Sequence, residues 1–475
     1  MAELKAWQRT VTCGALRAEN AGEEVTVAGW AETIRDHGGV TFIDLRDRTG
    51  VVQIVVDLSR NETSEAAHAE AQKIRAEYCI SVRGRVVQRI AGAENPHLPT
   101  GSIEVEAREI IVHNAARPLP FQLNEDTVTN NEEMRIKYRY LDLRRPAMYR
   151  KMWLRHEVVR RVRSYFYKND FLEIETPMLT KSSPEGARDY LVPYRLEPGL
   201  FYALPQAPQQ YKQLLMVSGI ERYFQIAKCF RDESQRADRQ PEFTQIDLEM
   251  SFVTQDDILN MVEGLMIEVV DGLAEETGKT ILHKPFPRIP YDEAMARYGS
   301  DKPDIRFGLE LTDCGAILEN TQFAVFQNVL KSGGLVKAIR YPGGASLPRS
   351  GMDELVNLSR EFGAKGFAYF LVDDGGAVTR GPVAKFLSDE EKAAIVTASE
   401  AQPGDLVGFI ADTKEMTNKV LDRLRRLIGD RLGLIDKSKL AYCWITDFPM
   451  YELNEETGLI DFSHNPFSMP QGELA

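Results

Sequence analysis

Residues 221–252 contain two segments in which polar and apolar side chains alternate, separated by a highly charged stretch at 231–240. Alternation with a period of two is typical of β-strands with one buried face, so ERYFQIAKCF and EFTQIDLEMSF predict a hairpin. In the second strand, the apolar face would carry Ile246, Leu248, Met250 and Phe252, and the polar face Gln245, Asp247, Glu249 and Ser251. The polar face either borders solvent or, with the charged loop beside it, lines a site.

A sheet with one apolar face needs helices to cover it, and two candidates flank the hairpin. Residues 151–170 place Leu154, Val158, Val162 and Phe166 on one face of a predicted helix, followed by a strand that ends at Pro177. After the hairpin, Thr254 and Asp257 form a capping-box pattern before a second helix.

The N-terminal part has a different pattern. Residues 24–57 hold three alternating segments separated by the turn signals HGG and RTG, residues 63–77 favour a helix, and two further strands follow. Five short strands with one helix fit a small OB-type barrel, whereas the alternative is a β domain of unassigned role. Recurrent glycine pairs beyond residue 290 favour a separate α+β segment.

The expected fold class is therefore a multidomain α+β protein. We expect an OB-fold barrel, a hinge, an antiparallel-sheet domain, an α+β insertion and the continuation of the sheet domain, with boundaries at 1–113, 114–150, 151–290, 291–430 and 431–475.

Composition limits the function classes. The formal net charge of −13 disfavours non-specific coating of nucleic acid or membrane, although a local patch can still grip RNA. The five cysteines are far apart and lack metal-site or disulfide spacing, and no apolar run approaches a membrane span. A cytoplasmic protein is expected. The GKT at 278–280 lacks P-loop spacing, and no GxGxxG follows a strand.

The charged hairpin has the right chemistry for a zwitterion beside a polyphosphate. Arginine offers a planar fork to phosphate or carboxylate oxygens, and carboxylates can hold an ammonium group. In detail, FRDE with RQPEFTQIDLEMSF resembles motif 2 of the class II aminoacyl-tRNA synthetases, in the form of the bacterial aspartyl enzymes. Residues 171–177 resemble motif 1, SSPEGARDYLVP resembles the mobile substrate loop, and the class I signatures HIGH and KMSKS are missing.

The resemblance implies a two-step reaction: ATP and L-aspartate form aspartyl-adenylate, and tRNA then takes the aspartyl group. It implies a homodimer and a requirement for Mg²⁺. Arg231 matches the catalytic arginine that touches both the substrate carboxylate and the α-phosphate; the alternative is a surface ion pair with Asp232 or Glu233. The residues that match ATP contacts are Arg231, Asp232, Glu233 and Gln240, and those that match aspartate contacts are Glu185, Gln209, Lys212, Arg231, Asp247 and His464.

Two substitutions in the aspartate pocket depart from the family pattern, because Asn465 replaces a second histidine and Ala207 a common serine. Lys212 would grip the side-chain carboxylate of aspartate. Asp247 would hold the substrate ammonium, or else lie on a solvated face.

The barrel would bind the anticodon through Arg35, Phe42 and Gln53, with Phe42 stacking on an unpaired base unless it is a core aromatic. His37 and Gly92 resemble the pattern of non-discriminating members, which charge both tRNA-Asp and tRNA-Asn. Thr33 replaces a common basic residue.

The sequence contains no motif 3 arginine and no family magnesium ligands, so we expect a truncated chain, no metal ligands within it, and weak or no adenylation as it stands. Three alternatives remain: a tRNA-binding protein without full catalysis, an amino-acid-activating paralogue that works without tRNA, and asparagine or lysine as substrate.

Overall fold

The computed structural model describes residues 7–60, 63–123, 132–183, 186–235, 239–453 and 458–463. The chain forms two compact units, residues 1–156 and 157–475, and each is described by itself.

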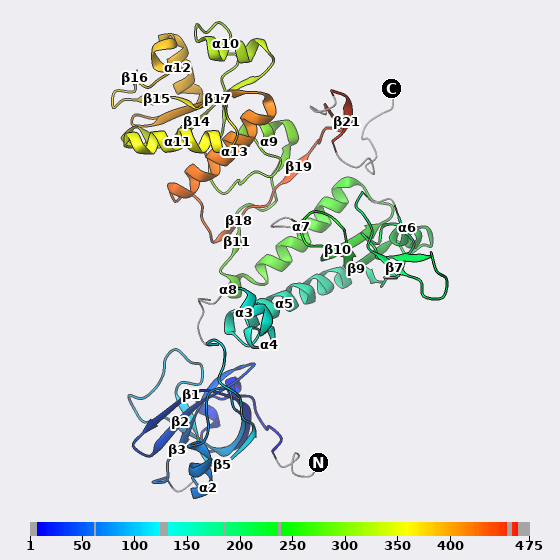
Figure 1. Ribbon diagram of the computed structural model, residues 1–475, viewed down its shortest axis with the longest axis vertical. Helices are drawn as coiled ribbons and strands as arrows, with labels where there is room; N and C mark the ends of the chain where they lie inside the picture. The colour runs from blue at the N-terminus through cyan, green and yellow to red at the C-terminus, as the bar shows by residue number, and fades with distance from the viewer. Residues whose placement is uncertain are drawn as a thin grey trace. The chain divides into compact units, whose positions relative to one another are not determined.

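The first unit begins with a closed five-stranded barrel, as the sequence predicts (Figure 1). Its strands are hydrogen-bonded in the order β1-β2-β3-β5-β4, and their bounds are β1 (Glu24–His37), β2 (Val40–Asp47), β3 (Gly50–Val56), β4 (Cys79–Gln88) and β5 (Ile103–Asn114). Short 3-10 turns precede β1, and helix α2 (Glu65–Ala71) lies between β3 and β4. The alternating aliphatic residues of all five strands fill one core.

Two glycines permit close contact between barrel strands. A Cβ at Gly84 would lie 2.0 Å from the carbonyl oxygen of Glu106, and a Cβ at Gly29 would lie 2.3 Å from that of Arg46. Any larger residue at either position would push neighbouring backbones apart.

Beyond the barrel, the first unit is largely helical over residues 132–156, although the sequence indicated only a polar hinge. It contains α3 (Glu132–Lys137), α4 (Arg139–Asp142) and the start of α5 (Pro146–Lys168). The fully buried carboxylate of Asp142 accepts hydrogen bonds from Arg135, Arg139 and Arg145, which explains how so basic a segment can pack. Helix α5 begins five residues earlier than its apolar pattern predicts, at a proline whose fixed φ suits a first helical turn.

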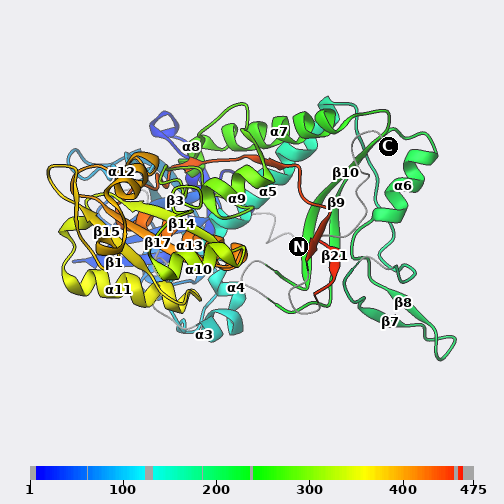
Figure 2. The same ribbon diagram turned by 90° about the horizontal axis from the view of Figure 1, so that it is seen from above.

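In the second unit, a three-stranded sheet has the order β10-β9-β6, formed by β6 (Leu172–Glu173), β9 (Arg222–Phe230) and β10 (Glu242–Met250). The predicted hairpin is confirmed, with Asp247 opposite Gln225. Helices α5 and α7 (Gln255–Asp271) lie along one face of the sheet (Figure 2), and their joint core stacks Phe166 on Phe224. The capping box of Thr254 and Asp257 is present.

One part of the predicted strand pattern is wrong. Phe252 does not join the apolar face, because β10 ends at Met250 and the backbone at Phe252 is left-handed, with a φ of 58°. Its side chain is 94% exposed, and Ile246 is also exposed.

Before β9, the chain forms the hairpin of β7 (Leu191–Pro193) and β8 (Phe201–Ala203), and then helix α6 (Gln209–Val217). After α7 come the short elements α8 (Ala274–Thr277), β11 (Thr280–Ile281), β12 (Arg288–Pro290) and α9 (Tyr291–Tyr298).

The following segment has the α+β character that its glycine pairs suggest. Its sheet has the order β13-β14-β17-β15-β16, with strands β13 (Thr312–Asp313), β14 (Leu335–Tyr341), β15 (Ala368–Val372), β16 (Val378–Arg380) and β17 (Leu406–Asp412). Alternate residues of these strands feed two cores. Helices α10 (Ala324–Lys331) and α12 (Asp389–Ala398) cover one face, and α11 (Arg349–Glu361) and α13 (Lys414–Arg431) cover the other (Figure 1).

Residues 439–451, within the segment expected to continue the sheet domain, form only short strands: β18 (Lys439–Leu440), β19 (Trp444–Thr446) and the start of β20 (Tyr451–Leu453), which pairs with β21 (Ile460–Phe462). Strands β18 and β19 pair in parallel with β11 and β12. The finer domain boundaries remain predictions. No described helix has the length and apolar character needed to cross a bilayer.

Candidate active site and RNA groove

Arg231 lies immediately after β9, at the base of the charged loop. Its backbone N–H donates to the carbonyl of Pro241 at 2.9 Å, and its guanidinium carbon lies 5.2 Å from the centre of the Phe243 ring. The guanidinium Nε is buried and has no hydrogen-bond partner within the described ranges. Buried donors are normally satisfied, so this one is available to an anion that binds over the hairpin.

Among the loop residues that the structure describes, no ion pair to Arg231 is formed. Glu233 forms its ion pair with Arg239, at 3.3 Å, rather than with Arg231. The backbone of Asp232 bonds to that of Arg188, which ties the motif 2 loop to the segment that resembles the mobile substrate loop. Asp232 and Gln240 are exposed, as contacts to a bound nucleotide need to be.

Lys212 of α6 reaches the polar face of β10. Its Nζ lies 2.8 Å from Asp247 and 3.3 Å from Glu249, so the predicted strand acids and the predicted lysine meet across 35 residues of sequence. Burial alone would lower the pKa of Lys212, but the hydrogen bond and negative charge of Asp247, with those of Glu249, raise it above its usual value. The ammonium is therefore held charged, and Asp247 is buried rather than solvated.

Two polar atoms at the polar face of β10 are thus free to bind a ligand within the described part of the chain. Asp247 keeps one carboxylate oxygen, Oδ2, buried with no hydrogen-bond partner in the described part of the chain. Phe243, beneath Arg231, and Asp247 point to the same face, about 13 Å apart along the strand. An unfilled guanidinium donor at one end and an unfilled carboxylate acceptor at the other suit a ligand with an anionic and an ammonium group.

Two buried glutamines escaped the sequence reasoning. Gln206, 1% exposed, accepts from the backbone N–H of Ala187 at 3.1 Å and donates to Asp189 at 2.5 Å, so it pins the loop beside the site. Gln225, opposite Asp247, accepts hydrogen bonds from Thr176 and Tyr223. The only sequence feature that marks Gln206 and Gln225 is an amide side chain among apolar neighbours.

The other residues predicted at the aspartate pocket are only partly covered by the described residues. Gln209 is half-buried in the first turn of α6, one turn before Lys212, and Ala207 lies just before that helix. Glu185 and His464 lie outside the described residues. Within the described residues, no group of three or more His, Cys, Asp or Glu side chains is arranged to hold a metal ion.

On the barrel, the predicted anticodon residues share one groove of about 510 Å³. Its lining includes Arg35, His37, Phe42, Gln53, Arg89, Asn95 and His97. Phe42 is absent from the barrel core and packs edge-on against His37, with 6.0 Å between ring centres. A half-exposed aromatic ring beside arginines matches the platform that single-stranded bases use.

The Gln53 side chain in this groove is held by two hydrogen bonds. It is 8% exposed, donates to Glu104 at 2.8 Å and accepts from Arg35 at 3.3 Å. Gly92 lies in the loop that closes the groove, beside the lining residue Ala93, and its φ of 88° is left-handed. The residues predicted to contact the anticodon therefore lie together in one groove, and Arg89 and His97 also line it; their anticodon role stays a prediction.

Comparison with known proteins agrees with this geometry. Residues 131–475 match the model of tRNA synthetases class II (D, K and N), and residues 25–112 match that of the OB-fold nucleic acid binding domain. The aspartate–tRNA(Asp/Asn) ligase of Rubrobacter xylanophilus is 52% identical over 98% of this chain and 76% of its own length. The aspartate–tRNA ligase of Geobacillus kaustophilus is 51% identical over 98% of this chain and 77% of its own.

Solved structures show the same fold. Asparaginyl-tRNA synthetase from Pyrococcus horikoshii, complexed with asparaginyl-adenylate, superposes with a TM-score of 0.53 at 21% identity, covering 86% of this chain and 94% of that one. A putative aspartyl-tRNA synthetase from Leishmania major gives 0.51 at 17% identity, covering 90% and 92%. The chain belongs to the class II aminoacyl-tRNA synthetases, within their family of aspartate–tRNA ligases.

Proposed function

We propose that this protein activates L-aspartate with ATP and transfers it to tRNA-Asp and to tRNA-Asn. The observation that carries the proposal is the pair of unfilled polar atoms over β10: the guanidinium Nε of Arg231 and the carboxylate Oδ2 of Asp247. Class II membership indicates the reaction, and the two atoms offer binding positions for the anionic and cationic groups of the substrates.

In the proposed first step, Arg231 bridges the α-carboxylate of aspartate and the α-phosphate of ATP. The carboxylate oxygen attacks phosphorus, the bond to pyrophosphate breaks, and aspartyl-adenylate forms. No protein nucleophile is required, because alignment and neutralisation of charge accelerate the displacement. Asp232, Glu233 and Gln240 contact the nucleotide in this proposal.

Aspartate is selected by charge. Lys212 binds its side-chain carboxylate, and Asp247 and Glu185 lie near its ammonium group, with Gln209 and His464 completing the pocket. A neutral asparagine would offer the Lys212 ammonium only an amide oxygen, which binds a cation less strongly than a carboxylate does, so aspartate is favoured. ATP as substrate is the ground for proposing Mg²⁺, but the described residues do not form a site for it, so none is assigned to the ion.

The test of the first step is aspartate-dependent ATP–pyrophosphate exchange, measured on this chain and on a version extended through motif 3. Arg231→Ala should reduce exchange about 100-fold or more, the usual loss when one donor to a developing charge is removed. An extended version whose Arg231→Ala variant exchanges as fast as its parent contradicts the mechanism.

Dual charging is proposed from His37 and Gly92, which lie at the anticodon groove formed with Arg35, Phe42 and Gln53. The relatives include proteins named as aspartate–tRNA ligase and as aspartate–tRNA(Asp/Asn) ligase. The test is therefore to measure aspartylation of both tRNA transcripts. Aspartylation of tRNA-Asp but not tRNA-Asn by the extended version would disprove it.

A backbone variant tests the loop directly. Gly92→Ala strains a left-handed position with open space around it and should change the ratio of tRNA-Asp to tRNA-Asn charging. Gly219→Ala is a matched control, with the same φ of 88° and nothing within 4 Å, but it follows α6 and should leave that ratio unchanged.

We also propose a homodimer in the cytoplasm. Motif 1 resemblance is joined by large exposed apolar side chains on or after α5, including Met152, Tyr167 and Leu172. All five cysteines are free, as a reducing compartment permits. Light scattering after size-exclusion chromatography distinguishes one copy from two.

A further inference from the structure

Glu77 is a buried carboxylate that no step above uses. It lies just before β4, is 5% exposed, and has a left-handed backbone with a φ of 62°. Its backbone N–H donates to the carbonyl of Ala31 in β1 at 2.6 Å. A non-glycine residue keeps such a conformation only where its surroundings hold it firmly, and such positions concentrate at functional sites.

The two oxygens of Glu77 serve two arginines from different parts of the first unit. Oε1 accepts from Arg46 of β2 at 2.7 Å, and Oε2 accepts from Arg144 at 2.9 Å. Arg46 also binds Glu32 at 2.9 Å, and the guanidinium of Arg144 lies 4.8 Å from the ring centre of Trp30.

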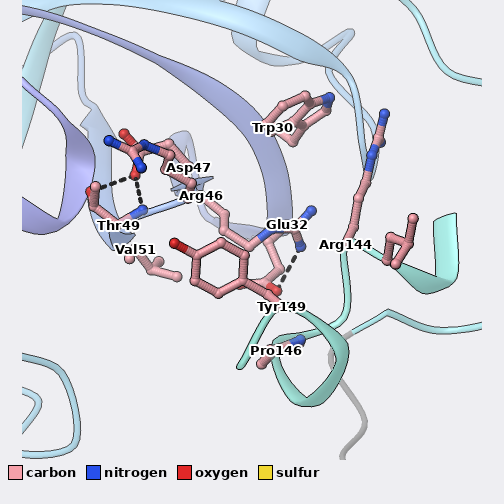
Figure 3. A pocket seen from close by; sticks show the side chains of 12 residues that line it. Trp30, Glu32, Arg46, Asp47, Thr49, Val51, Arg144, Pro146 and Tyr149 are labelled. Carbon is pink, nitrogen blue, oxygen red and sulfur yellow. Dashed lines mark hydrogen bonds and ion pairs between the residues drawn. The ribbon is translucent and has the colours of Figure 1, made fainter. Parts of the chain in front are cut away.

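The partners of Glu77 and their neighbours line a pocket of about 440 Å³ between barrel strands and the segment that starts α5 (Figure 3). Trp30, Glu32 and Arg46 come from the barrel, and Arg144, Pro146 and Tyr149 come from the helical segment. The carboxylate of Glu77 bridges the two segments directly, beside the contact of Arg144 with the Trp30 ring. Without it, two guanidinium groups would face each other across the join.

Arg144 precedes α5 by two residues, and α5 continues unbroken from Pro146 to Lys168, so it carries the chain from the first unit into the second. A link that fixes the start of α5 to the barrel therefore acts on the connection between the RNA groove and the catalytic unit.

We propose that Glu77 and Arg144 are positioning residues: they couple anticodon binding in the barrel to the binding of the rest of the tRNA, without contacting RNA or substrates themselves. This inference rests on the proposed tRNA function. Two linked binding surfaces gain affinity from their high effective concentration, and that gain falls when the connection between them loosens.

The experiment compares two RNAs at one stated salt concentration: the isolated anticodon stem-loop of tRNA-Asp and the whole tRNA-Asp transcript. The dissociation constant of the stem-loop divided by that of the whole tRNA measures how much affinity the remainder of the tRNA adds. Arg144→Met leaves Glu77 paired with Arg46, so the barrel and its stem-loop affinity should be unchanged. The whole tRNA should bind on the order of 10-fold more weakly, which lowers the ratio by the same factor.

Glu77→Gln excludes a direct contact between Arg144 and RNA. Removing a negative charge cannot remove an attraction to phosphate, so this variant should lower the ratio as Arg144→Met does. Arg144→Lys should restore part of the ratio, because it returns a cation to Glu77. Arg108→Met is the matched control: it removes an arginine of β5 that forms a 2.9 Å ion pair with Glu24 of β1, and it should leave the ratio unchanged.

Three results overturn the inference while the proposed function stands: an unchanged ratio in both variants, a fall in Arg144→Met alone, or equal weakening of stem-loop and tRNA. Failure of the parent chain to bind the stem-loop would instead overturn the proposed function, and the inference with it.

Discussion

Lys212 provides the sharpest test of how the site is held together. Replacing it with Met keeps the side-chain stem but removes the ammonium that lies between Asp247 and Glu249. The side chains of Lys212, Asp247 and Glu249 are 12%, 9% and 29% exposed, so water would only partly screen the two carboxylates from each other. Breaking a buried pair by removing one partner costs about 3–5 kcal/mol.

Hydrogen exchange of the β9 and β10 amides measures this cost locally, which matters because a chain of several domains does not unfold in one step. A loss of about 3 kcal/mol corresponds to exchange about 100-fold faster, compared between the variant and its parent at one fixed pH. Lys228→Met is the control on the same hairpin. Its pair with Glu242 is 53% and 56% exposed, so it should change exchange less than about fivefold.

The double variant with Asp247→Asn completes the cycle. Removing both charges should recover part of the protection, because the remaining groups are neutral or solvated. Equal acceleration by Lys212→Met and Lys228→Met would refute the reasoning, since burial would then make no difference to the value of the pair.

Three further outcomes are expected. The pKa of Lys212 is raised in the folded state. Its contribution to hairpin stability is therefore complete below the unfolded pKa of about 10.4 and is lost as pH rises through the folded value. Denaturant titrations above about pH 10 will show this loss as a falling midpoint. Phe42→Ala should weaken anticodon stem-loop binding by about 1–3 kcal/mol without lowering the melting temperature of the barrel, as measured by fluorescence anisotropy and circular dichroism. Gly84→Ala should unfold or greatly destabilise the barrel, seen as lost amide protection in β4 and β5, because its Cβ would overlap the carbonyl of Glu106.

Strand alternation and turn signals were sufficient to predict the barrel, the motif 2 hairpin and its two covering helices, because each depends on neighbours along the chain. The pattern does not reveal where a strand stops. Phe252 continues the alternation in sequence, yet its left-handed backbone directs it into solvent. Residues placed by motif resemblance, such as Lys212 and Asp247, do meet in space, although neither residue's neighbours indicate a partner 35 positions away.

The contacts that sequence reasoning missed are long-range polar ones. Arg425 is fully buried and donates to the backbone carbonyls of residues 304, 307, 308 and 309, over more than a hundred positions. Glu77 likewise binds Arg144 at a separation of 67. A charged residue within a helix or loop normally predicts exposure, so only the fold shows that these side chains are internal.

The parallel pairing of β11 with β18 and of β12 with β19 brings residues 280–290 alongside 439–446. Because the pairing is parallel, the chain leaves for the five-helix, five-stranded excursion after Pro290, which is paired with Thr446, and returns at Lys439, which is paired with Thr280 at the other end of the paired strands. A tight turn cannot join the ends of a parallel pair, so a shortened protein would need a linker long enough to run back beside these strands. The excursion has a core on each side of its own sheet, so such a shortened protein is expected to keep the pairing of β11 with β18 and of β12 with β19, and it would show directly what the extra module adds to tRNA charging.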